Sequence, residues 1–225
     1  MIQLLASGSR ARWVSHLLRD AGRDLSPARN ADSALETFAA LRLRRRLEPP
    51  VYEQVRACLA ADCIAIDLRP LRTRVLAARE EIARWPAADP ARFDHVMRRG
   101  SRSARKAMVR AIDSGDAADL HDWRKRAKRQ WYQAVHLEQH ERASLLQKLS
   151  RALGRHHDLS LLQDAIARHA DVLDAAACSV VFEAASRRSA ALEDDIIAVG
   201  TALFSATAGS SPAAPETQPT SDSSR

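Results

Sequence analysis

Aromatic residues are scarce in this chain of 225 residues, since Phe, Trp and Tyr together make up only 4% of it. Glycine is also rare, with 7 residues, which argues against a sheet-rich or loop-rich protein. The apolar residues are mainly Ala and Leu, a composition that favours closely packed helices. No long apolar run occurs, and the first ten residues lack a basic segment followed by an apolar stretch. Neither a membrane span nor a signal peptide is therefore predicted.

Cysteine is nearly absent, with Cys58, Cys63 and Cys178 alone. An odd and sparse count argues against a disulfide framework and suits a reducing cytoplasm, where we expect the protein. The spacing of Cys58 and Cys63 is not that of zinc ligands, so we expect buried small hydrophobic residues. The sequence also has no phosphate-binding glycine loop, no nucleophile elbow and no paired-acid arrangement. We therefore predict neither catalysis nor a cofactor.

Helical patterns cover almost the whole chain, and no useful alternation suggests a strand. Ser26-Pro27 has the form of an N-cap followed by proline at the first helical position. Gly154 predicts a helix end, and Asp158 predicts the cap of the next helix. The predicted helices are 27–46, 51–84 with a kink near Pro70, 90–112, a basic helix ending near Glu138 after a turn at 113–116, 142–153, and 158–204 with a break near Asp174.

The clearest boundary is the segment from Pro86 to Pro90. Two polar links, at residues 25–32 and 153–158, each join an upstream helix to a downstream one and indicate a weak internal repeat. We therefore predict an all-α fold with two related helical halves. The first half covers residues 1–86 and the second covers 87–204. Residues 205–225 are rich in Ser, Thr, Pro and Ala, and they predict a disordered tail.

Positive charge is concentrated in one segment. Between Arg92 and Tyr132 the chain has 12 Lys or Arg and 5 Asp or Glu, and the resulting +7 equals the net charge of the whole chain. At about 100° per residue, six side chains of the basic helix fall within an arc of roughly 140°. Because like charges on one helix face repel each other, this face predicts an anionic ligand. The face consists of His121, Arg124, Lys125, Lys128, Arg129 and Tyr132.

The preceding helix adds a second set of cations within an arc of roughly 100°. Because only a short turn separates the two helices, we expect their basic faces to line one groove. The set consists of Arg98, Arg102, Arg105 and Lys106.

Some residues of the basic helix have two interpretations. A lone histidine is usually structural, but at the start of a cationic face His121 is better explained as a donor to phosphate. Tyr132 could donate to phosphate or merely pack against its neighbours. Trp123 and Trp131 lie toward the other side of the helix and are predicted core residues.

A metal site is not predicted. The adjacent residues His156, His157 and Asp158 diverge around a helix, and no second histidine pair with a carboxylate accompanies them. The acidic run Glu193–Asp195 is better explained by solvent exposure or by ion pairs with Arg187 and Arg188.

Three segments together resemble the CHAD domain, the conserved histidine α-helical domain. Residues 120–132, Leu-His-Asp-Trp-Arg-Lys-Arg-Ala-Lys-Arg-Gln-Trp-Tyr, are similar to the family's His-x-x-Arg-Lys-x-x-Lys-Arg-x-x-Tyr helix. Residues 153–159, Leu-Gly-Arg-His-His-Asp-Leu, are similar to its Leu-Gly-x-x-His-Asp-Leu link. Residues 26–32 are similar to the Arg-Asp link of its first half.

The resemblance implies two antiparallel helical bundles around a basic cavity, and a role in binding inorganic polyphosphate, in some members at polyphosphate granules. The two links add Arg29 and His157 to the candidate site. The family's first half opens with its own basic helix. Nothing in residues 1–24 matches that helix, so we expect the first bundle to lack it.

Two other functions remain open. The basic field also permits a helical nucleic-acid-binding protein, although few aromatic residues are free to stack on bases and no helix-turn-helix pattern stands out. The unmatched first helix is also compatible with a regulatory fragment of a triphosphate-processing enzyme. We favour a non-enzymatic module that binds polyphosphate or another polyanion.

Overall fold

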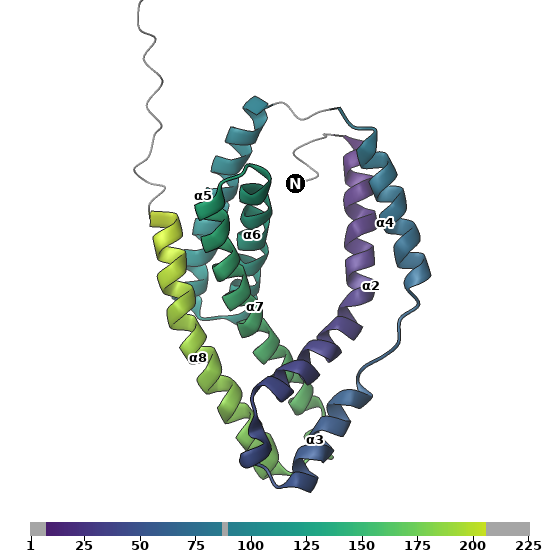
Figure 1. Ribbon diagram of the computed structural model, residues 1–225, viewed down its shortest axis with the longest axis vertical. Coiled ribbons are helices and arrows are strands. Elements are labelled where there is room, and N and C mark those ends of the chain that lie inside the picture. The colour runs from purple at the N-terminus through teal and green to yellow at the C-terminus, as the bar shows by residue number, and fades with distance from the viewer. Residues whose placement is uncertain (1–7, 87–89, 206–225) are drawn as a thin grey trace, which may run out of the picture.

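The computed structural model describes residues 8–86 and 90–205, with the side chains of residues 90–94 and 205 left out. Every regular element in these ranges is a helix, which confirms the predicted all-α class (Figure 1). Of the predicted tail, Ser205 is the last residue of the final helix, and residues 206–225 lie outside the described residues. The elements are α2 (Ser9–Ala40), the 3₁₀-helix η1 (Leu43–Arg45), α3 (Pro49–Ala61), α4 (Leu68–Ala83), α5 (Pro90–Ser114), α6 (Ala117–His136), α7 (His140–Arg168) and α8 (Ala175–Ser205).

Several predicted boundaries are confirmed. Helix α5 begins at Pro90, where a missing N–H costs no intrahelical hydrogen bond. The turn before α6 contains Gly115 at φ 65°, a conformation that glycine adopts without a steric penalty. The break near Asp174 is also present, because the Asp174 carboxylate accepts a hydrogen bond of 3.0 Å from the Ala177 amide at the start of α8.

The two predicted polar links are wrong, because both lie inside continuous helices. Ser26 does not cap a helix: its hydroxyl donates to the Gly22 carbonyl at 2.8 Å, and Pro27 lies within α2. Proline removes one helical hydrogen bond, and the two parts of α2 point in different directions (Figure 1). Gly154 and Asp158 lie in the middle of α7, where packing outweighs the modest helical penalty of glycine.

Two further helix limits also differ from the prediction. The predicted helix 51–84 is two helices, and the kink near Pro70 is wrong, since Pro70 lies in the first turn of α4. That turn is capped by Asp67, whose carboxylate accepts from the Arg69 amide at 3.0 Å. The first helix ends at Ala40 instead of Arg46, because Arg42 adopts the left-handed conformation that stops it.

The helices pack around two hydrophobic clusters. One joins α5, α6, α7 and α8 around the fully buried Trp123 and Phe204. The other joins the end of α2 and α3 to the far end of α7 and the start of α8, around Phe38. The second cluster therefore takes residues from both sides of the boundary predicted near residue 87. In Figure 1 the molecule has two arms. One consists of α2 and α4, the other consists of α5 to α8, and the two meet at the lower tip. None of the described helices is long and apolar enough to cross a membrane.

Candidate anion-binding site

The orientation of α6 is set by its apolar residues. Trp123, Ala127 and Ala134 are fully buried against α7 and α8, so the predicted core position of Trp123 is confirmed. Gly200 of α8 makes room for the indole, since a Cβ atom there would lie 2.6 Å from Trp123 Cζ2. Trp131 is partly buried against the same cluster and stacks on Tyr132. Burial of this side turns the cationic side of α6 away from the core.

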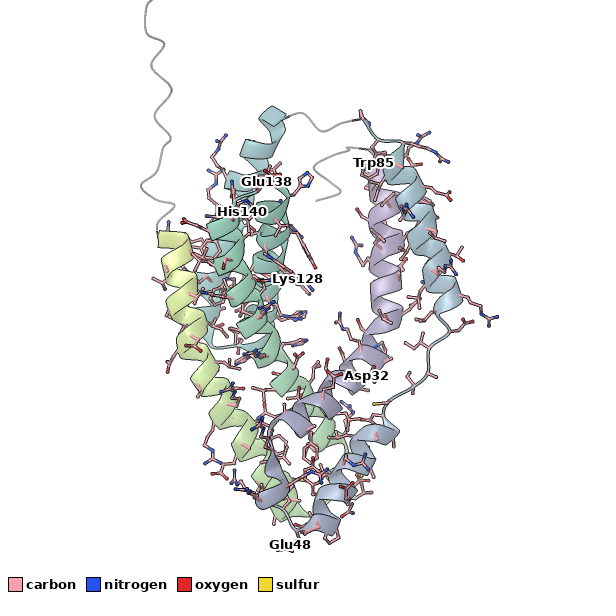
Figure 2. All side chains as sticks on the ribbon, in the orientation of Figure 1. Asp32, Glu48, Trp85, Lys128, Glu138 and His140 are labelled. Carbon is pink, nitrogen blue, oxygen red and sulfur yellow. The ribbon has the colours of Figure 1, made fainter. Side chains whose placement is uncertain are left out.

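The exposed part of the predicted basic face has no neutralising partners. Lys125, Lys128 and Arg129 are exposed and make no ion pair with any described residue. Lys128 lies on the side of α6 that faces α2 (Figure 2). Its ammonium is 5.9 Å from the ring centroid of Tyr132, which is 49% exposed. Several cations are thus held close together without a carboxylate among them.

The inner part of the site joins three helices. The rings of His121 on α6 and His157 on α7 lie 4.6 Å apart, centroid to centroid. Arg124 lies beside Gly154, where a Cβ atom would be 3.8 Å from its Nε. Arg29 of α2 is close enough to act electrostatically on Arg124 and on His157. The structure therefore brings together residues from all three segments that carry the CHAD resemblance.

The electrostatics of this cluster keep both histidines neutral at pH 7. Burial, followed by the charge of Lys125, lowers the pKa of His121 to about 4. Burial, followed by the charges of Arg124 and Arg29, also lowers the pKa of His157. A neutral imidazole still donates one hydrogen bond, and an anion nearby would favour its protonated form.

Asp158 lies beside these cations, a position that differs from the one expected from the sequence. It was predicted to cap a helix, but it lies within α7 and acts electrostatically on Arg124. Burial raises the pKa of Asp158, while Arg124 and Arg29 oppose the rise. The Leu-Gly-Arg-His-His-Asp segment could have revealed this role, because in a continuous helix Gly154 and Asp158 are one turn apart.

Two polar atoms of the site are buried without a hydrogen-bond partner in the described part of the chain, His121 Nδ1 and Arg124 Nε. Buried polar groups are almost always hydrogen-bonded, because leaving one unpaired costs about 1–3 kcal/mol. Both atoms belong to predicted ligand-binding side chains. The site can therefore offer donors that no protein acceptor uses.

The cations of α5 do not join this site, contrary to the expected shared groove. Helix α5 meets α6 through Gly100 and Ser103, which contact the side chains of Gln130 and Arg126. The predicted set lies about 120–160° around the helix axis from Gly100. Its members Arg98, Arg102, Arg105 and Lys106 are exposed on the outer side of α5.

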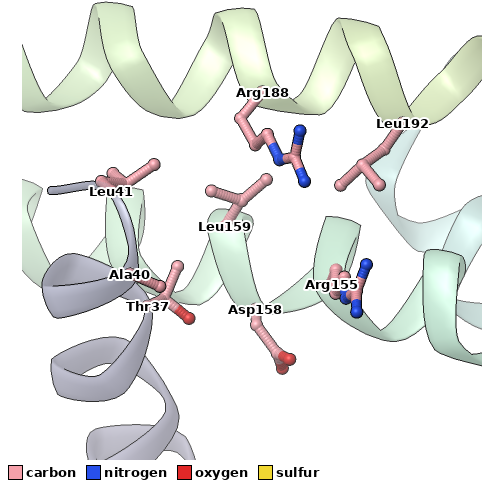
Figure 3. Close-up of a pocket in the computed structure, with 8 residues that line it drawn as sticks. All are labelled: Thr37, Ala40, Leu41, Arg155, Asp158, Leu159, Arg188 and Leu192. Carbon is pink, nitrogen blue, oxygen red and sulfur yellow. The ribbon is translucent and has the colours of Figure 1, made fainter.

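The acidic run on α8 is exposed at all three positions, which confirms the expected solvent exposure, and its one ion pair among the described residues is not with Arg187 or Arg188. Glu193 pairs with His156 at 3.0 Å, and Arg187 pairs with Glu183 at 3.5 Å. Next to this contact is a cavity of about 370 Å³ between α2, α7 and α8, with Arg155 and Arg188 in its lining (Figure 3). Sequence reasoning missed these two arginines because they lie on different helices. Within the described ranges, no group of three or more His, Cys, Asp or Glu side chains could hold a metal ion.

Comparison with known proteins identifies the family of this chain. The search of curated proteins gives no match, and the search of solved structures gives none either. The family model described as the CHAD domain matches residues 3–167, a range that includes α6 and the part of α7 that carries His157. Because the match covers well over half of the sequence, the chain belongs to the CHAD domain family.

Proposed function

We propose that this protein is a non-enzymatic module that binds inorganic polyphosphate along the basic face of α6 and the adjoining residues of α7 and α2. The observation that carries the proposal is a cluster of cations that no ion pair neutralises, with the half-buried Asp158 as the acid beside Arg124 and Arg29. Arg29, Arg124, Lys125 and Lys128 form no ion pair with a described residue, and the cluster contains two buried, unpaired polar atoms. The family to which the chain belongs is linked to polyphosphate binding in general.

The chemistry of the site suits a repeating phosphate chain. Guanidinium groups match phosphate oxygens through two parallel hydrogen bonds, while lysine ammonium groups add less directional attraction. Charge-assisted hydrogen bonds to phosphate are about twice as strong as neutral ones. Such contacts require no sequence readout and no chemical step, so binding alone accounts for the arrangement. The three half-buried free thiols suit a reducing compartment, and we propose a cytoplasmic location.

The proposal is tested by calorimetric titration with polyphosphates of several defined lengths, and with duplex DNA at the same phosphate concentration. We expect affinity to rise with polyphosphate length until the cationic surface is covered, and to exceed the affinity for DNA. Polyphosphate is flexible enough to follow Arg124 and Lys128 on α6 and Arg29 on α2, whereas a duplex presents a fixed phosphate spacing.

Equal affinity for DNA and polyphosphate at matched salt would contradict the proposal and favour nucleic-acid binding. Hydrolysis of the polyphosphate during the titration, measured as release of orthophosphate, would contradict the proposal that the protein is not an enzyme. A matched control is available in Arg72 and Arg79, which are exposed on α4. Replacing both with Ala removes the same charge as replacing two site cations and should leave affinity nearly unchanged.

A further inference from the structure

A second cluster of arginines lies where α2 ends and η1 begins. Four stand within five residues, Arg42, Arg44, Arg45 and Arg46. Arg46 is neutralised by Glu183 of α8 at 2.8 Å. Arg44 reaches Glu53 only at 3.9 Å, and Glu53 is already held by Arg56 at 2.6 Å. Arg42 and Arg45 form no ion pair with the part of the chain that the structure describes.

Three of these arginines, all but Arg46, line a cavity. Its volume is about 580 Å³, and its lining is Ala39, Arg42, Arg44, Arg45 and Tyr52. The Arg44 guanidinium lies 4.7 Å above the Tyr52 ring, and the ring stacks on buried Phe38 at 4.9 Å. This stack holds Arg44 in place, because a guanidinium packs favourably on an aromatic face.

The backbone at this cavity is also unusual. Arg42 has φ 53° and ψ 41°, in the left-handed region that residues with a Cβ rarely adopt. Such conformations persist where the surrounding structure imposes them, and they are concentrated at binding sites. Here the left-handed turn ends α2 and brings Arg42 to the same cavity as Arg44 and Arg45.

We propose that this cavity is a second anion site, which takes a short phosphate anion such as pyrophosphate. Three arginines line a volume within the usual range of ligand pockets, and a guanidinium can bind phosphate oxygens through two hydrogen bonds. One face of Tyr52 is occupied by Arg44 and Phe38 packs against the ring, so no platform for a nucleobase is free. A compact anion without a base therefore fits the lining best.

The second site is separate from the basic face of α6. Glu48, just beyond η1, lies at the lower tip of the molecule, whereas Lys128 lies in the upper part (Figure 2). No residue of the cavity belongs to α6 or α7. The second site therefore does not depend on the proposed binding of polyphosphate to α6.

The test is calorimetric titration of the full chain with pyrophosphate at low salt. The variant Arg42→Asn with Arg45→Ala removes two cations, and Asn tolerates the left-handed conformation of position 42. We expect this variant to bind pyrophosphate about tenfold or more weakly than the wild type, since two charge-assisted contacts are lost. The control Arg72→Ala with Arg79→Ala should bind within about twofold of the wild type, because screened distant charges contribute little.

Equal weakening in the two variants would overturn the proposal, since the effect would then come from net charge alone. Retained affinity in the Arg42 and Arg45 variant would also overturn it. If that variant melts at a lower temperature, Arg45→Gln alone must still weaken binding, because it removes the charge of this exposed residue, keeps a polar side chain and leaves Arg42 in place.

Two further titrations separate this site from the one on α6. The variant Arg124→Ala with Lys128→Ala should keep a pyrophosphate site, and losing all binding in it would place the anion on α6 and overturn the proposal. Long polyphosphate added to the Arg42 and Arg45 variant identifies the natural occupant. Unchanged affinity indicates a free short phosphate, whereas weaker binding indicates the end of a polyphosphate chain.

Discussion

The two sides of α6 carry cations of the same kind but meet different surroundings. On the side toward α5, Arg126 donates to Asp122 at 2.9 Å, and Asp122 also accepts from Arg110 at 2.7 Å. On the opposite side, Arg124 and Lys128 have no such partners among the described residues. Of the α6 cations, Arg126 alone is on the side toward α5 and is paired, whereas Arg124, Lys125, Lys128 and Arg129 are on the other side and keep charge for a ligand.

The difference shows that the absence of neutralising ion pairs, more than the number of charges, identifies a binding surface. The pKa of Asp122 is lowered, first by its hydrogen bond with Arg126 and further by Arg110, which means that the ion pairs of this side are already formed. On the other side, burial lowers the pKa of Arg124, so the fold makes its charge less favourable instead of stabilising it. A surface of that kind is retained at a cost in stability, which a bound anion can offset.

The largest effect should come from removing cations of the uncompensated side. Arg124→Ala with Lys128→Ala should weaken polyphosphate binding about hundredfold or more, since each charge-assisted contact is worth about 1.5–3 kcal/mol. The melting temperature should stay nearly unchanged or rise slightly, because repulsion between like charges is relieved. Titration and thermal unfolding of the same variant test both statements.

The matched control is the compensated side. Arg110→Ala with Arg126→Ala should leave affinity within about twofold while lowering the free energy of unfolding by about 1 kcal/mol, as expected for partly exposed ion pairs. If the control lost affinity as strongly as the Arg124 and Lys128 variant, the distinction between the two sides of α6 would be wrong.

The salt dependence of binding should show the same contrast. Each phosphate contact releases counterions, so the logarithm of the association constant should fall steeply and linearly with the logarithm of salt concentration. Each lost contact should lower this slope by about one unit, which predicts a decrease of about two units for the Arg124 and Lys128 variant. The Arg110 and Arg126 variant should keep the wild-type slope, and a flat response of the wild type would exclude phosphate contact as the mechanism.

Gly200 of α8 and Gly154 of α7 allow the packing on the core side of α6 to be compared with the packing on its basic side. A Cβ atom at position 200 would lie 2.6 and 2.8 Å from the fully buried Trp123 ring, so Gly200→Ala should destabilise the fold by about 1–3 kcal/mol. A Cβ atom at position 154 would lie 3.8 Å from Arg124, an ordinary contact. Gly154→Ala should therefore stabilise α7 by about 0.5–1 kcal/mol. Denaturant unfolding gives both values, and destabilisation by Gly154→Ala would argue against a continuous α7.

The smallest expected effect is a pH dependence of binding. A bound polyanion favours protonated imidazoles, so it should raise the pKa of His121 above about 4 and also raise that of His157. Between the free and bound pKa values, binding takes up protons, and affinity should rise a few-fold as pH falls from 8 to 5. The variant His121→Gln with His157→Gln should show a flatter profile. Calorimetry in buffers of different ionisation enthalpy measures the uptake, and its absence in the wild type would exclude contact with these rings.

The same histidine predicts a stability change without ligand. In the unfolded chain His121 has its ordinary pKa of 6.5, whereas in the folded protein its pKa is about 4. Between these values the unfolded state binds more protons, so the free energy of unfolding should fall as pH falls from 6.5 toward 4. Comparison of the wild type with His121→Gln isolates this contribution from that of Asp158, whose raised pKa acts in the opposite direction.

Much of the fold follows from local patterns in the sequence. The all-α class, the start of α5 at Pro90 and the break at Asp174 were predictable, because apolar spacing, proline and capping residues act within one or two helical turns. The basic face of α6 was visible for the same reason. The continuous helices through Pro27 and Gly154 were not predictable, because burial of the surrounding residues overrides local stop signals.

The sequence by itself determined the all-α class, the concentration of positive charge and the residues of α6 that share one face, since composition and helical periodicity set these features. Only the tertiary structure decided which cations are neutralised. It pairs Arg110 of α5 with Asp122 of α6, turns Arg102 of α5 outward, and brings Arg29 and His157 to Arg124 from helices far apart in the chain. Those outcomes depend on how helices pack against each other, and Coulomb interactions act over a few ångströms in space, whatever the separation along the sequence.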